Sequence, residues 1–258
     1  MNWYPQVGAG SIVQLPVSRT RKWRAITNSL ESGEQVMLPD RTAGQIEWKL
    51  TYQDLSSAEA QSLSSLFTSS HGPFAPFAFV DPMANLLGWS EGLSQSCWQA
   101  GLMQVNAGVG DPLGTQRASS VANPNTAPQM LQQTLAIPGS YVACFSAYLS
   151  SAVPGTVILQ RDGNQTTVHV GPGWTRAYMS GLGANGAGQS TFSIVVGSGQ
   201  LVNVWGLQVE AQPYPSAYKQ TGEPAGIYQE TYFAGDELTM TSTGPGLSAC
   251  EIALISRV

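Results

Sequence analysis

Charged residues are scarce in this sequence. Asp, Glu, Lys and Arg make up 10% of its 258 residues, whereas ordinary soluble domains carry about 25%. The net charge of −5 is modest, which argues against a nucleic-acid surface, so we expect no sequence-specific contact with nucleic acid. No apolar run approaches the ~18 residues of a membrane-spanning helix, and we expect no membrane insertion. The N-terminal segment also lacks the apolar core of a signal peptide, which predicts folding in a cytoplasm.

Cysteine and histidine are equally rare. Cys97, Cys144 and Cys250 are far apart and lack metal-ligand spacing, so we expect buried apolar side chains rather than a disulfide framework. The two histidines, His71 and His169, stand in different parts of the chain, and no H-E-x-x-H or P-loop pattern occurs. We therefore expect no catalytic residue, no metal and no cofactor.

Glycine and proline are abundant, with 28 and 16 residues, and together with many Ser and Thr they predict short strands joined by turns. In QIEWKLTYQ, apolar and polar residues alternate as in a strand with one buried face. In the SSAEAQSLSSLF that follows, Ser56 and Glu59 fit a capping box, which predicts a short helix. In PFAPFAFVDP we expect Phe74, Phe77 and Phe79 in the core.

The few charges are unevenly distributed. Residues 1–85 and 219–258 together hold 20 charged residues in 125 positions, whereas 86–218 hold 7 in 133. The C-terminal segment also contains strand patterns, DELTMTST and SACEIALIS, that lack a core of their own. We therefore predict an all-β protein of two β-sandwich domains. Residues 1–85 plus 219–258 form the first domain, with one short α-helix, and 86–218 form a jelly roll inserted into it.

Residues 86–218 contain many short strand patterns. TLAIPGSYVACFSAYLSS predicts two strands, and TVILQRDGNQTTVHV predicts a hairpin whose Asp162-Gly163 suits a tight turn. GWTRAYMS, TFSIVVGS and LVNVWGLQVE supply further strands. Strands that recur at short intervals, with no helix between them, are typical of a jelly roll or a related sandwich.

Two families resemble these segments. The order IPGSYVACFSAYLS, GWTRAYMS, VWGLQVEAQPYPSAYKQT is similar to carbohydrate-binding-module-like jelly rolls of bacterial and phage proteins, over nearly all of residues 90–221. The stretch from RAITNSLESGEQ to FVDPMAN, with the returning C-terminal strands, resembles phage tail proteins of the distal-tail type. This second resemblance implies a hexameric ring between tail tube and baseplate hub, with an outward sandwich. It also implies a location in the virion tail, assembled in the host cytoplasm.

Sugar sites on sandwiches use aromatic faces and planar polar side chains. The family pattern places Tyr148 on the face away from the core. Gln160 and His169 flank the predicted Asp162-Gly163 hairpin, and Arg176 is near in sequence. We therefore predict these four residues as contacts to a host surface glycan. The alternative is structural: Tyr148 covers a core edge and His169 is a solvated strand residue.

Trp174, Trp205 and Glu210 are three further candidates in this segment. In simple alternation Trp205 shares its face with the apolar residues of VWGLQV, and Trp174 starts a strand after Gly-Pro-Gly, so both are expected in the core. Glu210 lies on the opposite face. A structural calcium at Glu210 is the weaker alternative to no metal, because a lone carboxylate is a poor calcium site.

The run RTRKWR concentrates positive charge in the N-terminal segment. It spans residues 19–24 and contains Arg19, Arg21, Lys22 and Arg24. We predict these four residues as an assembly interface, because complementary charge fixes the register between subunits. The alternative is a solvated strand face.

These expectations combine into one functional prediction. The chain is a structural tail-tip protein and not an enzyme. It forms a homo-oligomer, for which the distal-tail resemblance implies a hexameric ring, whereas a trimer would suit a fibre or a receptor-binding tip. Its partners are the tail tube protein and the baseplate hub protein. The alternative is a free-standing carbohydrate-binding adhesin or another minor tail or receptor-binding protein.

Overall fold

The computed structural model describes residues 2–8, 10–184, 186, 188–223 and 226–257. Of residues 41–43 it describes the backbone only. The chain divides into two compact units. Unit 1 comprises Met1–Gly8, Ile12–Phe79 and Tyr228–Val258, and unit 2 comprises Ala9–Ser11 and Val80–Ile227. The domain boundaries predicted from the sequence, 85/86 and 218/219, both fall inside unit 2.

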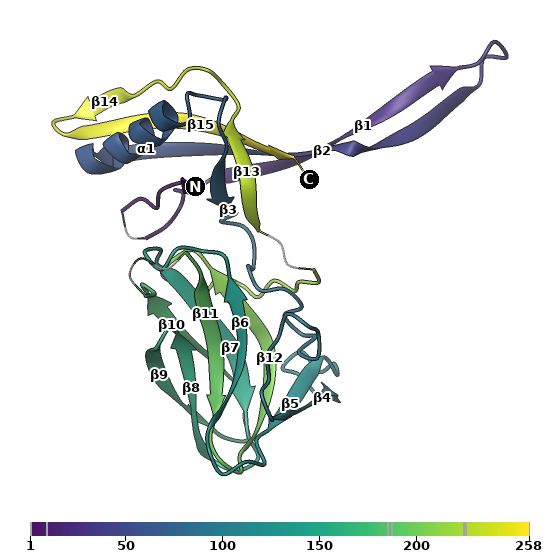
Figure 1. The fold of residues 1–258 in the computed structure, drawn as a ribbon, viewed down its shortest axis with the longest axis vertical. Coiled ribbons are helices and arrows are strands. Elements are labelled where there is room, and N and C mark those ends of the chain that lie inside the picture. The colour runs from purple at the N-terminus through teal and green to yellow at the C-terminus, as the bar shows by residue number, and fades with distance from the viewer. Residues whose placement is uncertain (1, 9, 185, 187, 224–225, 258) are drawn as a thin grey trace. The chain divides into compact units, whose positions relative to one another are not determined.

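Unit 1 is built on a six-stranded sheet with a helix (Figure 1). The strand order is β1-β2-β15-β13-β3, and β14 pairs with β15 off this path. The elements are β1 (Val17–Ser29), β2 (Gln35–Ser56), α1 (Ser57–Ser69), β3 (Phe77–Val80), β13 (Ile227–Phe233), β14 (Thr241–Gly244) and β15 (Leu247–Arg257).

The helix begins where its capping box predicts. The Oγ of Ser56 accepts a hydrogen bond from the amide of Glu59, and the Glu59 carboxylate accepts one from the amide of Ser56 at 2.8 Å. Leu63 and Leu66 are the buried side chains of α1. All four apolar residues of QIEWKLTYQ are buried in β2, so the strand and helix predictions for this segment are confirmed.

Aromatic side chains make up much of the unit 1 core. Phe77 and Phe79 are fully buried, as predicted, and Phe79 packs edge-to-face on Trp48 with ring centroids 4.9 Å apart. Phe74 is 83% exposed, so its predicted place in the core is wrong. It lies in the turn between α1 and β3, where the chain runs over the surface.

The sheet joins the two ends of the chain. β15 pairs antiparallel with β2, so that Ile252 lies opposite Leu50 and Leu254 opposite Trp48. These four side chains are buried on one face. The core of unit 1 is therefore complete only when strands about two hundred positions apart in sequence meet.

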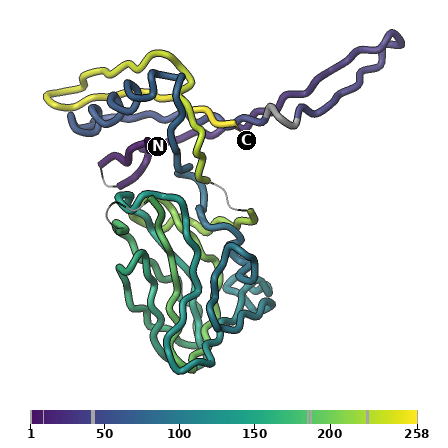
Figure 2. Tube along the Cα trace, viewed as in Figure 1, coloured from purple at the N-terminus to yellow at the C-terminus, as the bar shows by residue number. Residues whose placement is uncertain are grey.

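A two-stranded arm extends beyond this sheet. β15 pairs with β2 only as far as Gln45, whereas β1 and β2 continue to pair as far as Ser29 and Gln35. Figures 1 and 2 show this hairpin projecting past the C-terminal end of β15. We call residues 23–40 the arm. Nearly all of its side chains are exposed.

Unit 2 is a two-layer jelly-roll sandwich, and the all-β prediction is confirmed. One sheet has the order β10-β7-β12-β5-β4 and the other β6-β11-β8-β9. The strands are β4 (Gln104–Val109), β5 (Ala118–Ala122), β6 (Gln129–Leu135), β7 (Ala143–Ser150), β8 (Gly155–Arg161), β9 (Asn164–Val170), β10 (Thr175–Gly181), β11 (Ser190–Val196) and β12 (Leu201–Glu210).

The chain enters and leaves unit 2 at one place. The amide of Asp81 donates to the carbonyl of Gly226 at 2.7 Å, and the amide of Leu86 donates to the carbonyl of Val209 at 2.9 Å. Adjacent ends are what an inserted domain requires, because the host sheet then needs little rearrangement to receive it.

The cysteines are free thiols. Cys144 and Cys250 are buried as predicted, and Cys97 is half-buried. In the part of the chain that the structure describes, no helix has the length and apolar character to cross a bilayer.

A buried arginine holds the loops at one end of the jelly roll. Arg161 is 1% exposed, and burial lowers its pKa to about 10, although the nearby Asp162 opposes this shift. Its guanidinium donates to four acceptors, namely the carbonyls of Pro138, Tyr141 and Gly181 and the Oγ of Ser190.

Replacing Arg161 tests this account. We expect Arg161→Ala to lower the free energy of unfolding of unit 2 by about 3 kcal/mol, because it leaves several buried acceptors without a donor. Chemical denaturation monitored by circular dichroism measures the change. Gln165→Ala, at an exposed position on β9, is the control and should shift stability by less than about 0.5 kcal/mol. Equal effects of the two variants would contradict the account.

Candidate functional site

The five-stranded sheet of unit 2 has a polar and aromatic face. Along β7, Phe145, Ala147 and Leu149 point into the sandwich core, while Ser146 and Tyr148 point to the other side. Tyr148 therefore lies on the face away from the core, as predicted.

A row of aromatic rings and cations crosses this face. Arg176 on β10 lies opposite Tyr148, with its Cζ 5.4 Å from the tyrosine ring. Tyr148 contacts Trp205 on β12 at 5.0 Å between centroids, and Trp205 contacts Tyr218 at 4.8 Å. The Cζ of Arg117 lies 5.8 Å from the Trp205 ring. We call these five residues the cation–aromatic row.

A bulge in β12 puts Trp205 in this row. The register of β12 against β7 shifts between Trp205 and Gln208, and Gly206 has φ +63°. Trp205 therefore lies on the face opposite Leu207 and Val209, and its prediction as their neighbour is wrong. It is nevertheless 3% exposed, because the rings beside it and Arg117 cover it.

The segment after β12 folds back over the C-terminal end of this face. The Glu210 carboxylate accepts hydrogen bonds from Lys219 Nζ at 2.8 Å, Gln208 Nε2 at 2.7 Å and the Ser216 amide at 2.9 Å. Burial alone would raise the pKa of Glu210, but the bonds from Lys219 and Ser216 hold that pKa below its usual value. The calcium alternative does not fit here, since the lysine ammonium already neutralises this carboxylate.

A cavity of about 550 Å³ adjoins the row at Arg117. Trp89, Glu91 and Gln220 are among the residues that line it. Arg117 donates to the amide oxygen of Gln220 at 3.0 Å and lies 3.4 Å from Glu91 Oε1. Burial raises the pKa of Glu91, an effect that Arg117 partly offsets. The cavity wall thus combines an indole, an amide and the ion pair of Arg117 with Glu91. The same guanidinium lies 3.9 Å from Asp111 Oδ2.

The four predicted glycan contacts are divided between two sheets. Tyr148 and Arg176 are register partners on the five-stranded sheet. Gln160 and His169 lie on β8 and β9 of the four-stranded sheet, where Gln160 is half-buried and His169 exposed. The predicted single surface does not form, because β7 and β8 are consecutive strands of opposite layers.

Other predicted residues are placed as follows. Trp174 immediately precedes β10 and is half-buried rather than fully buried in the core. Arg19, Arg21, Lys22 and Arg24 all lie exposed on β1, an edge strand of the unit 1 sheet. Lys22 pairs with Glu47, and Arg24 pairs with Asp40. Among the described residues, no group of three His, Cys, Asp or Glu side chains is arranged to hold a metal ion.

GWSEG, residues 88–92, matches the G-x-S-x-G pattern of nucleophilic serines, a match that the enzyme prediction did not take into account. Ser90 is fully buried. Its Oγ lies 2.7 Å from the hydroxyl of Tyr218 and accepts a hydrogen bond from the amide of Thr221 at 2.9 Å. Residues 88–91 form bends rather than the strand-to-helix turn of a nucleophile elbow. The hydrogen bonds of Ser90 instead hold the segment that contains Tyr218 and Thr221.

No protein-family model matches the sequence, and no curated protein matches it. Among solved structures, a family 22 carbohydrate-binding module of Clostridium thermocellum Xyn10B is 18% identical, with a TM-score of 0.41, over 51% of this chain and 96% of that one. A xylan-binding domain from the same module family is 17% identical, with a TM-score of 0.42, over 52% and 99%. The enzymatically active domain of tailspike protein 4 of bacteriophage CBA120 is 15% identical, with a TM-score of 0.37, over 51% of this chain but only 22% of that chain.

The bulge glycine offers a direct test of the row. A Cβ on Gly206 would lie 3.1 Å from Tyr148 and 3.4 Å from Tyr218, at a φ that side chains rarely adopt. We expect Gly206→Ala to cost about 1–2 kcal/mol of stability and to change the tryptophan fluorescence. Gly173→Ala, where a Cβ meets open space, is the control. Thermal unfolding measures both variants, and a neutral Gly206→Ala would contradict the bulge geometry.

Proposed function

We propose that this chain is a structural protein of a phage tail tip, of the distal-tail type. Unit 1 assembles into a ring that joins the tail tube protein to the baseplate hub protein, and unit 2 displays a glycan-binding face to the host. The cation–aromatic row is the observation that carries the glycan part of this proposal. The virion tail, assembled in the host cytoplasm, is the proposed location.

The accessible end of the row suits a sugar ring. Tyr148 is half-buried, and Tyr178, beside Ser146 in the next register position on β10, is 45% exposed. Sugar C–H faces pack on tyrosine rings, while hydroxyls accept hydrogen bonds from a guanidinium. Arg176 donates to Ser146 Oγ at 3.1 Å, which holds its planar group over Tyr148.

Weak individual contacts are sufficient in a ring. A millimolar site contributes only about −4 kcal/mol. Several copies held at fixed spacing can gain orders of magnitude by avidity when the receptors match that spacing. Reversible scanning of a cell surface therefore needs no strong single site.

We propose no catalytic role, because the acidic side chains of unit 2 named here have structural partners. Glu210 faces Lys219, and Asp162 accepts from the amide of Thr191 at 2.7 Å. Glu91 and Asp111 both face Arg117, which lies between them and neutralises them, and Asp111 also accepts from the amides of Leu113 and Arg117. A glycosidase needs two carboxylates within roughly 5–10 Å across a substrate site.

Two pairs of variants test the glycan site. We expect Tyr148→Ala and Arg176→Ala to weaken binding to host surface polysaccharide about tenfold, because each removes a ring contact or a donor worth about 1–1.5 kcal/mol. Gln160→Ala and His169→Ala, on the other sheet, are the matched controls and should bind like the wild type. Titration calorimetry with the full chain measures the affinities. The reverse pattern would move the site to the four-stranded sheet, and no binding by the wild type would leave unit 2 as a spacer.

Electron microscopy tests the ring. Negative-stain class averages of the purified chain should show closed rings with six-fold symmetry. Trimers would favour a peripheral receptor-binding protein, and monomers that still bind glycan would favour the free-standing adhesin.

A further inference from the structure

A buried carboxylate oxygen in unit 2 has no hydrogen-bond donor. The side chain of Glu91 is 9% exposed, and its Oε1 accepts no hydrogen bond from the part of the chain that the structure describes. Arg117 Nη1 lies 3.4 Å away but donates to Gln220 Oε1 instead, at 3.0 Å. Burial raises the pKa of Glu91, and Arg117, Tyr218 and Trp205 offset that rise only in part. A buried acceptor without a donor is costly, so Glu91 needs a donor that the chain does not supply.

This carboxylate belongs to the wall of a cavity large enough for a small ligand. Glu91 lines the cavity of about 550 Å³ at Arg117, and small-molecule sites measure about 300–1,000 Å³. Gly108 and Gly222 are also part of the wall. A Cβ on either glycine would meet no atom within 4 Å. The wall is therefore open enough at these positions to admit a ring.

The cavity offers hydrogen-bond donors beside this acceptor. Arg117 Nη1 and Nε are engaged with Gln220 and Thr115. Among the described residues, Arg117 Nη2 and Gln220 Nε2 have no hydrogen-bond partner. Both residues line the cavity. A ligand that satisfies this wall must carry a donor and an acceptor next to each other.

Trp89 supplies an aromatic surface whose backbone is held at both ends. It lines the same cavity and is half-buried. Its amide donates to the carbonyl of Gly222, and its carbonyl accepts from Nε1 of Trp98 at 3.0 Å. Its φ of +50° is unusual for a bulky residue, and backbone strain of this kind collects at ligand-binding sites. An indole held in this way suits stacking with the apolar face of a ring.

Neutral sugars carry the donor–acceptor pair that this wall requires. Two adjacent hydroxyls of one ring can donate to Glu91 Oε1 and accept from Arg117 Nη2 or Gln220 Nε2. An ammonium group has donors only and would face the Arg117 guanidinium. A sugar carboxylate has acceptors only and would face Glu91, with Asp111 3.9 Å from the same guanidinium. The wall therefore selects an uncharged ring.

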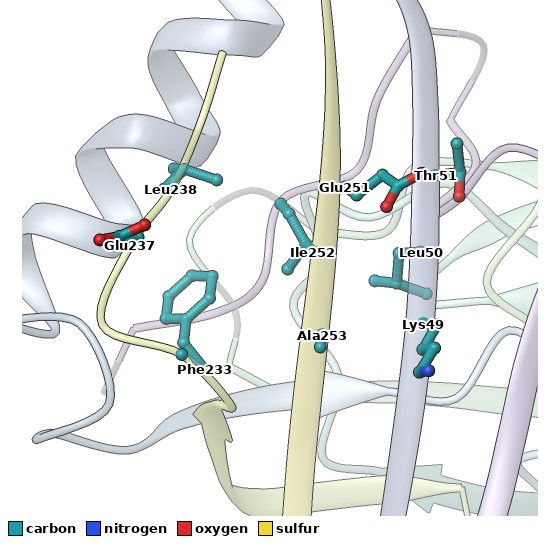
Figure 3. A pocket seen from close by; sticks show the side chains of 10 residues that line it. Lys49, Leu50, Thr51, Phe233, Glu237, Leu238, Glu251, Ile252 and Ala253 are labelled. Atoms are coloured by element: carbon teal, nitrogen blue, oxygen red, sulfur yellow. The ribbon is translucent and has the colours of Figure 1, made fainter.

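The cavity of about 480 Å³ beside β15 in unit 1 lacks this combination (Figure 3). Lys49, Glu237 and Glu251 line it, and all three are exposed. In the described part of the chain, none of their side-chain nitrogen or oxygen atoms is both buried and without a partner. Water satisfies exposed groups of this kind, so that cavity has no comparable requirement for a ligand.

We infer that the cavity at Glu91 is a second glycan position of unit 2 and binds a neutral hexose. One hydroxyl of the sugar donates to Glu91, the adjacent hydroxyl accepts from Arg117, and the ring packs on Trp89. This inference rests on the proposed glycan binding and adds the class of sugar and the residues that select it. The Tyr148 end of the row is a different position, since the buried Trp205 ring lies between Tyr148 and Arg117.

Nuclear magnetic resonance titration of the full chain tests this position. The probes are the methyl glycosides of glucose, galactose and mannose, with glucosamine and glucuronic acid as charged counterparts. We expect at least one methyl hexoside to bind and to shift the indole N–H signal of Trp89, which Trp89→Phe identifies. The two charged sugars should bind at least about tenfold more weakly, because each lacks a partner for one side of the wall.

Two variants separate the cavity from the rest of unit 2. Glu91→Gln should weaken binding of the hexoside about tenfold, because it removes a hydrogen bond to a charged group. Gly222→Leu should abolish the binding, because it puts a side chain into the cavity. Gly173→Leu, at a glycine outside the cavity whose Cβ would also meet open space, is the matched control and should bind like the wild type.

The results distinguish this inference from the proposed function. A preference for glucosamine or glucuronic acid would overturn the assignment of a neutral sugar. Hexoside binding that neither Glu91→Gln nor Gly222→Leu changes would overturn the position. If the wild type binds host surface polysaccharide in a manner that Tyr148→Ala weakens, but binds no hexoside, the cavity inference fails and the proposed function stands. If it binds neither polysaccharide nor hexoside, both fail.

Discussion

The pairing of β2 with β15 is the constraint on which the rest of the structure depends. Trp48 and Leu50 reach full burial only because Leu254 and Ile252 stand opposite them. Neither end of the chain can bury its apolar strand residues alone, so the intervening segment must leave this sheet and return to it. The bond between Asp81 and Gly226 brings the two crossings together, which keeps the entropic cost of closing so long a connection low.

Within the jelly roll, a single glycine, Gly206, decides on which face of the sheet Trp205 lies. Strict alternation along β12 would place Trp205 in the core beside Leu207. The bulge at Gly206 turns the indole to the opposite face, between Tyr148 and Tyr218. One extra residue in a strand therefore converts an apolar core position into the centre of a polar surface. That surface is the one that we propose for glycan binding.

The arm belongs to a sheet whose strands have unequal lengths. β1 and β2 extend past β15 at one end, and β13 and β14 leave part of β15 uncovered elsewhere. Folding of a single chain removes neither feature, which makes both available for contact between chains. The charge content of unit 2 is lower than that of unit 1.

Local physical chemistry determined the all-β class, the buried face of QIEWKLTYQ, the capped helix at Ser56 and the tight turn at Asp162. Periodicity, capping and turn residues act over a few neighbours, so a sequence displays them directly. Only the tertiary structure decided that Trp205 joins Tyr148, and that Gln160 and His169 lie in another layer. It alone also decided that strand β1 continues into a free arm. Those outcomes depend on sheet assignment, on strand register and on where pairing ends, and each is fixed by contacts between residues far apart in sequence.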